Sequence, residues 1–139
     1  GVDRHVHDAG VHGDEMVGAE GLGDDGGVGA QAGLHQRVRA LAALGLASHA
    51  GHDIAARQMH DFGGMLSVEL RADRAETLAV AGRLRLFTNA TSLGGCESLV
   101  EHRASVEGRT PVSPQNLLRI SVGLENPDDL IEDWERVLR

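Results

Sequence analysis

The 139-residue chain is long enough for one ordinary domain, and its formal net charge is −8. All 13 basic residues are arginine, so no lysine is present to form an imine or to bind phosphate. The acidic balance argues against nucleic acid or an anionic membrane as a partner. The single cysteine, Cys96, excludes an intrachain disulfide, and no run of 18 apolar residues occurs. We therefore expect a cytoplasmic protein without a membrane span.

The amino-acid composition changes near residue 34. Residues 1–33 contain ten glycines and seven acidic residues but no Phe, Trp, Tyr, Ile or Pro. So few large apolar side chains cannot offset the loss of chain entropy on folding, which predicts an irregular, disordered segment. Its string GLGDDG (21–26) has dinucleotide-loop spacing, but the polar flanks and two aspartates disfavour phosphate. The His-rich stretch 5–14 has metal-ligand residue types but no predicted scaffold to hold a metal.

From residue 34 onward the chain has the periodicities of a folded domain. The spacing of apolar residues predicts helices and strands in turn, with a tight turn between the second and third strands. The predicted helices are 34–44, 51–62 and 73–86, and the predicted strands are 64–71, 86–90 and 97–102, with the turn at 91–96. In a further strand, 117–124, Arg119 lies on one face and Leu118, Ile120, Val122 and Leu124 lie on the other. The strand alone favours a solvated surface charge for this arginine.

The last helix has strong sequence signals. Asn126 is a suitable N-cap, Pro127 suits the first helical position, and two aspartates follow at the positive end of the helix dipole. An apolar stripe predicts one buried face; it comprises Leu130, Ile131, Trp134, Val137 and Leu138. The order of elements predicts a mostly antiparallel sheet with helices on one face. The face that carries Arg119 is then free to contact something else.

Four strings in this region occur in a familiar order: GLASHAGHDIAARQM, FGGMLSVEL, LRLFTNATSLGGCESLVEHRASVEG and LLRISVGLE. Residues 45–139 thereby resemble the C-terminus of the Cys/Met-metabolism pyridoxal-phosphate enzymes, which include cystathionine γ-synthase, γ-lyase and β-lyase and methionine γ-lyase. The resemblance implies an α/β fold, the small C-terminal domain of a fold-type-I pyridoxal-phosphate enzyme. Residues 34–139 would form this substrate-binding domain, and residues 1–33 do not match the family.

The resemblance also implies roles for individual residues. Arg119 matches an arginine that binds the substrate α-carboxylate, which a guanidinium can hold through two parallel hydrogen bonds. Ser92 and Leu93 match residues beside the substrate, and the two glycines after them let the backbone pass close to a ligand. The alternative for SLGG is a tight turn without a binding role. Thr91 departs from the acidic residue often found before this serine.

By the same resemblance the cofactor is pyridoxal phosphate, the substrate is a sulfur amino acid, and the enzyme is a homotetramer. Its cofactor lysine belongs to a large domain that this chain lacks, so we expect no catalytic residue here. Two functions remain open. The chain is either part of a cystathionine γ-lyase or γ-synthase type enzyme, or a non-catalytic fragment or interaction module. Cys96 is expected to be a small buried thiol, and His49, His52 and His60 are expected to have surface or packing roles.

Overall fold

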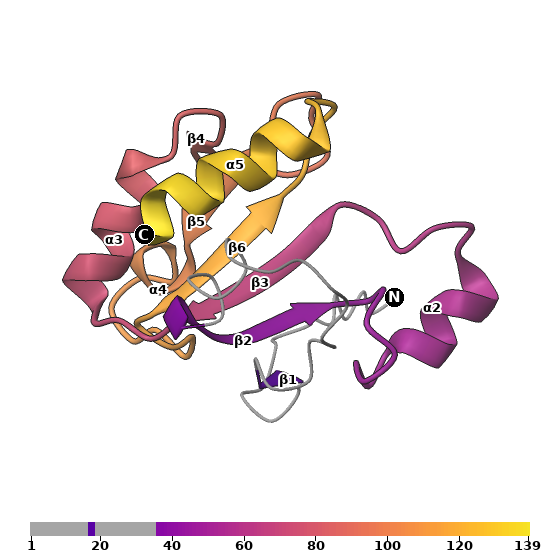
Figure 1. Cartoon of the computed structure of the whole chain (residues 1–139). Coiled ribbons are helices and arrows are strands. Elements are labelled where there is room, and N and C mark those ends of the chain that lie inside the picture. The colour runs from indigo at the N-terminus through magenta and orange to yellow at the C-terminus, as the bar shows by residue number, and fades with distance from the viewer. Residues whose placement is uncertain (1–16, 19–35) are drawn as a thin grey trace, which may run out of the picture.

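The computed structural model describes residues 17–18 and 36–139, which form a six-stranded sheet with helices packed on it (Figure 1). The strand order is β1-β2-β3-β6-β5-β4, and every pair is antiparallel except β4 with β5. The strands are β1 (Val17–Gly18), β2 (Val38–Ala43), β3 (Met65–Leu70), β4 (Thr88–Asn89), β5 (Leu99–His102) and β6 (Leu117–Ser121). The helices are α2 (His52–Gln58), α3 (Arg74–Arg83), α4 (Arg103–Val106) and α5 (Pro127–Leu138). The predicted α/β fold with a mostly antiparallel sheet is confirmed.

The predicted helix over 34–44 is wrong, because Val38–Ala43 is a strand. Alanine and leucine have high intrinsic helix propensity, which the sequence pattern reflects. In the structure β2 lies between β1 and β3, and its backbone bonds to both neighbours. Pairing within the sheet therefore overrides local propensity in this segment.

The strand that carries Arg119 is shorter than predicted and ends at Ser121. Val122 N–H still bonds to Gly64 O, just before β3. The following N–H groups bond to the segment before β5, with Gly123 N–H donating to Ser98 Oγ and Leu124 N–H donating to Cys96 O. As a result Leu124 is 85% exposed and does not join the apolar face that the alternation predicted. Helices α2 and α3 form within their predicted ranges, and β4 is only two residues long.

The core lies between the sheet and helices α3 and α5. Side chains from both helices pack on the apolar sheet face in one cluster that includes Leu70, Val100 and Leu118. Asn126 caps α5 as predicted, by accepting the Asp128 N–H at 2.9 Å. A buried carboxylate, Asp133 on α5, accepts the backbone N–H groups of Arg85 and Leu86 at 2.7 and 2.9 Å. These two bonds tie α5 to the segment that follows α3.

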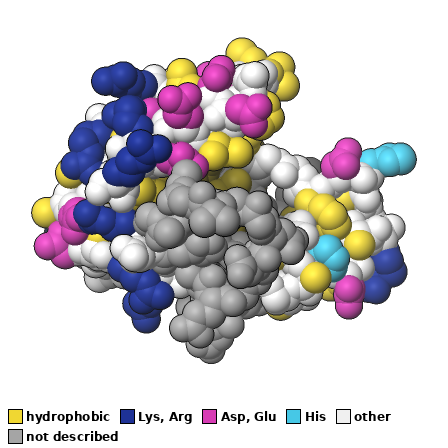
Figure 2. Space-filling model, viewed as in Figure 1, with side chains coloured by type: hydrophobic (Ala, Val, Ile, Leu, Met, Phe, Trp, Pro, Cys, Tyr) yellow, Lys and Arg dark blue, Asp and Glu magenta, His cyan; other side chains and the backbone are white. Residues whose placement is uncertain are grey.

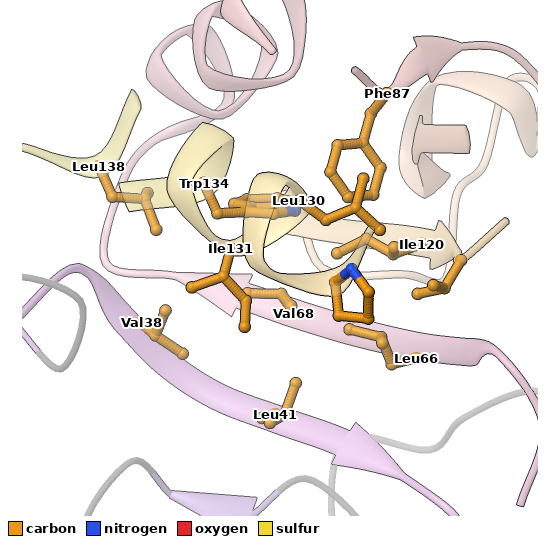
Figure 3. Close-up of a pocket in the computed structure, with 12 residues that line it drawn as sticks. Val38, Leu41, Leu66, Val68, Phe87, Ile120, Leu130, Ile131, Trp134 and Leu138 are labelled. Atoms are coloured by element: carbon orange, nitrogen blue, oxygen red, sulfur yellow. The ribbon is translucent and has the colours of Figure 1, made fainter. Parts of the chain in front are cut away.

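An apolar groove of about 380 Å³ is lined by residues of α5 and of the strands β2, β3 and β6 (Figure 3). Figure 3 shows Ile131 of α5 pointing toward the strands that carry Val68 and Leu41, and Leu130 lying beside Phe87 and Ile120. Ile131 belongs to the predicted apolar stripe but is 55% exposed, because it borders this groove. In Figure 2, hydrophobic side chains are visible between α5 and the sheet, while charged side chains gather on the outer surface of the helices.

The predictions for residues 1–33 can be compared with the structure only at Val17–Gly18, which pair with β2. The predicted disorder of the other residues lies outside the described part of the chain, as do the His-rich stretch 5–14 and the string 21–26. Within the described ranges, no helix has the length and apolarity needed to cross a membrane.

Candidate functional site

Arg119 lies in the middle of β6 on the sheet face opposite α5. Its register partners are Ser67 on β3 and Glu101 on β5. Its two strand neighbours, Leu118 and Ile120, are buried in the core on the other face. The strand alternation thus separates the arginine from the core, as predicted from the sequence.

The guanidinium of Arg119 forms an ion pair with a buried carboxylate. Its Nη2 lies 2.9 Å from Oε2 of Glu101, whose other oxygen, Oε1, accepts from Nη1 of Arg103 at 3.0 Å. Glu101 is 3% exposed, and the Arg119 side chain is 22% exposed. Arg119 is therefore not the freely solvated charge that the strand alone favoured.

Sequence reasoning did not identify Glu101. Its position in the string ESLVEH was visible, but the pairing of β5 with β6 was not. Without this register, nothing in the sequence places Glu101 opposite Arg119. The alternation of side chains along a strand would have found the pair once the neighbouring strands were known.

The loop 91–96 meets the same sheet face through its backbone. The carbonyl oxygen of Ser92 accepts from Nη2 of Arg119 at 3.3 Å, and Gly94 N–H donates to Ser121 Oγ at 3.2 Å. Gly94 has φ +73°, a conformation that glycine adopts without strain. Leu93 is exposed at the outside of this loop. The structure therefore brings Ser92 into contact with Arg119 and leaves Leu93 open beside them.

The two sequence motifs that carry the family resemblance are hydrogen-bonded to each other. The carboxylate of Glu125 accepts both the N–H and the Oγ–H of Ser98 at 2.8 Å, and Ser98 Oγ in turn accepts Gly123 N–H at 2.9 Å. The bonds from Ser98 hold the pKa of Glu125 below its ordinary value. This network fixes the end of the 91–96 loop to the end of β6.

Gly123 is the position where these two segments lie closest. A Cβ atom there would be 2.4 Å from the carbonyl oxygen of Cys96 and 2.5 Å from the carbonyl carbon of Glu97. Both contacts are with backbone atoms, which cannot rotate away. The string SVGLE therefore needs glycine at this position to let the loop approach the strand.

Cys96 and the histidines show how far the other residue expectations hold. Cys96 is exposed rather than buried, with its Sγ 3.4 Å from Oε2 of Glu97, because it lies on the surface loop that leads into β5. His52 has the expected packing role, since its ring stacks on Phe62 at 4.9 Å and its Nδ1 bonds to Leu44 O. Over the described residues, no group of three or more His, Cys, Asp or Glu side chains could hold a metal ion.

The chain is similar to known enzymes of sulfur amino-acid metabolism. It is 46% identical over 109 residues to cystathionine gamma-synthase of Mycobacterium tuberculosis, with 75% of this chain and 28% of that protein covered. It is 44% identical over 112 residues to cystathionine beta-lyase of Coxiella burnetii, with 75% and 29% covered. A crystal structure of cystathionine gamma-synthase from Xanthomonas oryzae pv. oryzae in complex with cystathionine matches with a TM-score of 0.69 and 41% identity. That match covers 78% of this chain and 31% of the solved one.

The chain therefore spans less than a third of the length of these relatives. A family model described as Cys/Met metabolism PLP-dependent enzyme matches residues 33–139, which include every described helix and all strands except β1. The chain belongs to the family of Cys/Met-metabolism enzymes that depend on pyridoxal phosphate.

Proposed function

We propose that residues 33–139 supply the substrate α-carboxylate site of an enzyme of cystathionine γ-synthase or γ-lyase type. The observation that carries this proposal is the placement of Arg119. Its guanidinium lies on the sheet face away from the helices, in contact with the 91–96 loop. The names of the relatives, which include a gamma-synthase and a beta-lyase, support a sulfur amino acid as the substrate.

The residues of this chain do not fit a covalent pyridoxal-phosphate site. Enzymes of this class attach the cofactor through the amine of a lysine, and the 139 residues include none. The proposal therefore assigns the cofactor to the part of the relatives' length that this chain does not span. It assigns to this chain the binding and orientation of the substrate, within a cytoplasmic homotetramer that has the relatives' metabolic role.

The hydrogen bonds of Arg119 define how a carboxylate would bind. A guanidinium offers parallel N–H pairs on two edges, and Nη2 belongs to both of them. In the structure Nη2 contacts Glu101 at 2.9 Å and the Ser92 carbonyl at 3.3 Å. A carboxylate that takes two parallel bonds must replace one of these contacts. The longer bond, to the neutral Ser92 carbonyl, is the weaker of the two, so the substrate takes the place of Ser92 O.

Clamping the carboxylate serves alignment as well as affinity. A bidentate pair fixes the plane of the carboxylate and so limits rotation of the substrate about its Cα. The Ser92 carbonyl that the substrate displaces belongs to the 91–96 loop, so this loop lies beside the bound carboxylate. Exposed Leu93 on that loop is then positioned to contact the rest of the substrate. In this proposal Arg119, Ser92 and Leu93 form one substrate-binding set.

The test uses a full-length enzyme that carries residues 33–139 as its C-terminal region. L-Norleucine has no leaving group, so it binds without elimination, and L-norleucinamide differs only in lacking the carboxylate. Replacing Arg119 by lysine should weaken competitive inhibition by norleucine by about tenfold or more, since a point charge cannot make the bidentate pair. Inhibition by norleucinamide should change by less than about twofold. Equal effects on both inhibitors would contradict the carboxylate role.

A second candidate function is a non-catalytic fragment or interaction module, which the absence of lysine favours. Pyridoxal phosphate mixed with the 139-residue chain should then give no imine absorbance that survives gel filtration. The chain should also show no turnover of cystathionine. Turnover by this chain alone would contradict the fragment interpretation and the assignment of the cofactor to another segment.

A further inference from the structure

The arrangement of β5 and β6 assigns a role to Glu101. We propose that Glu101 is a positioning residue that holds the guanidinium of Arg119 in the orientation needed for a substrate carboxylate. This inference rests on the proposed role of Arg119. It adds a second residue, one that does not itself touch the substrate.

Glu101 is suited to this role because its own position is fixed. It is directly opposite Arg119 in the antiparallel pair of β5 and β6, so both side chains leave the sheet on the same face. Glu101 is 3% exposed, and its two carboxylate oxygens bond to different arginines, Arg119 at 2.9 Å and Arg103 at 3.0 Å. A carboxylate bonded at both oxygens cannot turn freely, so it presents a fixed acceptor to Nη2.

Arginine needs such an acceptor more than a short side chain does. Its side chain has several rotatable bonds, and an unrestrained guanidinium samples many orientations. The Ser92 carbonyl is also in contact with Nη2, but the substrate takes its place. Glu101 is then the remaining described side chain that orients the guanidinium while the substrate is bound.

Electrostatics alone predicts the opposite effect of Glu101 on binding. A carboxylate next to Arg119 repels the carboxylate of an incoming substrate and neutralises part of the guanidinium charge. If this effect dominated, removing the charge of Glu101 would tighten binding. If positioning dominates, removing the acceptor loosens binding. The sign of the change therefore separates the two.

Two substitutions separate the charge from the hydrogen bond. Glu101→Gln removes the charge but keeps an amide oxygen that can accept from Nη2, whereas Glu101→Leu removes both. In the full-length enzyme, Glu101→Leu should weaken inhibition by norleucine by about tenfold or more and leave norleucinamide within about twofold. Glu101→Gln should recover most of that loss and stay within about threefold of wild type. The matched controls are Glu132→Leu and Glu132→Gln, at an exposed position on α5.

Each other outcome overturns the inference in a distinct way. Tighter norleucine binding in both Glu101 variants would mean that Glu101 acts by charge. Equal weakening of norleucine and norleucinamide would mean that Glu101 only supports the fold. A normal Glu101→Leu enzyme beside an impaired Arg119→Lys enzyme would refute the positioning role alone. If Arg119→Lys is also normal, the proposed function itself fails.

If the Glu101→Leu enzyme does not fold, the Arg103→Gln enzyme tests the positioning role of Glu101 instead. Arg103 is partly exposed and bonds to the Glu101 oxygen that Arg119 does not use. Its loss frees that carboxylate to turn, so norleucine should inhibit about three- to tenfold more weakly and norleucinamide should be unaffected. An unchanged ratio between the two inhibitors would overturn the proposal.

Discussion

Replacing Asp133 by alanine should strongly destabilise the chain without altering the substrate face. Asp133 is 5% exposed, and its Oδ2 accepts two backbone N–H groups, from Arg85 and Leu86. Truncation leaves both donors without this partner. A hydrogen bond to a charged group contributes about 1.5–3 kcal/mol, so the two bonds, which share one oxygen, should together cost about 3 kcal/mol.

The assay is urea unfolding of the 139-residue chain, followed by Trp134 fluorescence. With a urea dependence of about 1.5 kcal/mol/M for a domain of this size, the midpoint should fall by about 2 M. Glu132→Ala is the matched control, because it changes the adjacent exposed carboxylate on the same helix. If the Asp133→Ala midpoint lay within about 0.5 M of this control, the two bonds would not hold α5 in place.

Three further predictions concern two carboxylates with lowered pKa values, the close contact at Gly123 and the apolar groove. Burial acts to raise the pKa of Asp133, but its hydrogen bonds outweigh this effect and the pKa is lowered. The bonds from Ser98 lower the pKa of Glu125. Both carboxylates therefore protonate at lower pH in the folded chain than in the unfolded chain. The free energy of unfolding, measured in urea, should therefore be constant near neutral pH and fall as the pH drops below about 4.5. In the Ser98→Ala variant this fall should be shallower. A free energy of unfolding that rises as the pH drops would contradict the prediction. Gly123→Ala should cost about 1–3 kcal/mol, because its Cβ meets the backbone of residues 96 and 97, and an unchanged urea midpoint would refute the close contact. The apolar groove and the sheet face that carries Arg119 should make the chain self-associate. Sedimentation that shows only monomer, together with a cooperative thermal unfolding transition at high temperature, would oppose this prediction.

The elements that the sequence predicted best are those whose sequence signals are local and do not depend on pairing with distant segments of the chain. Helix α5 has its cap, its first-turn proline and its apolar stripe within 13 residues. The cap and the proline are as predicted, and Leu130, Val137 and Leu138 of the stripe are buried, whereas Ile131 is exposed. Strand β2 lacked such signals. Its alanines favour a helix locally, and only pairing with β1 and β3 makes it a strand. The end of β6 depends in the same way on the 96–98 segment, which no local pattern reveals.

In the candidate site, too, local patterns predicted some residues, and strand pairing was needed for the others. Alternation in the strand predicted that Arg119 would face away from the core, and the family motifs pointed to Ser92 beside it. Glu101 could not be found, because its importance depends on the register between β5 and β6. The exposure of Cys96 was missed because a lone cysteine is usually buried, and only the course of the surface loop overrides that tendency.

The central claim is that Arg119 binds the substrate α-carboxylate. The most direct measurement is kcat/KM for cystathionine in a full-length enzyme that carries residues 33–139, with Arg119 replaced by lysine. Loss of a charge-assisted bidentate pair is worth about 2–4 kcal/mol, which predicts a decrease of about 30- to 1000-fold. The matched control, Arg109→Lys in the exposed segment after α4, should change kcat/KM by less than about threefold. An Arg119→Lys enzyme within about threefold of wild type would contradict the account.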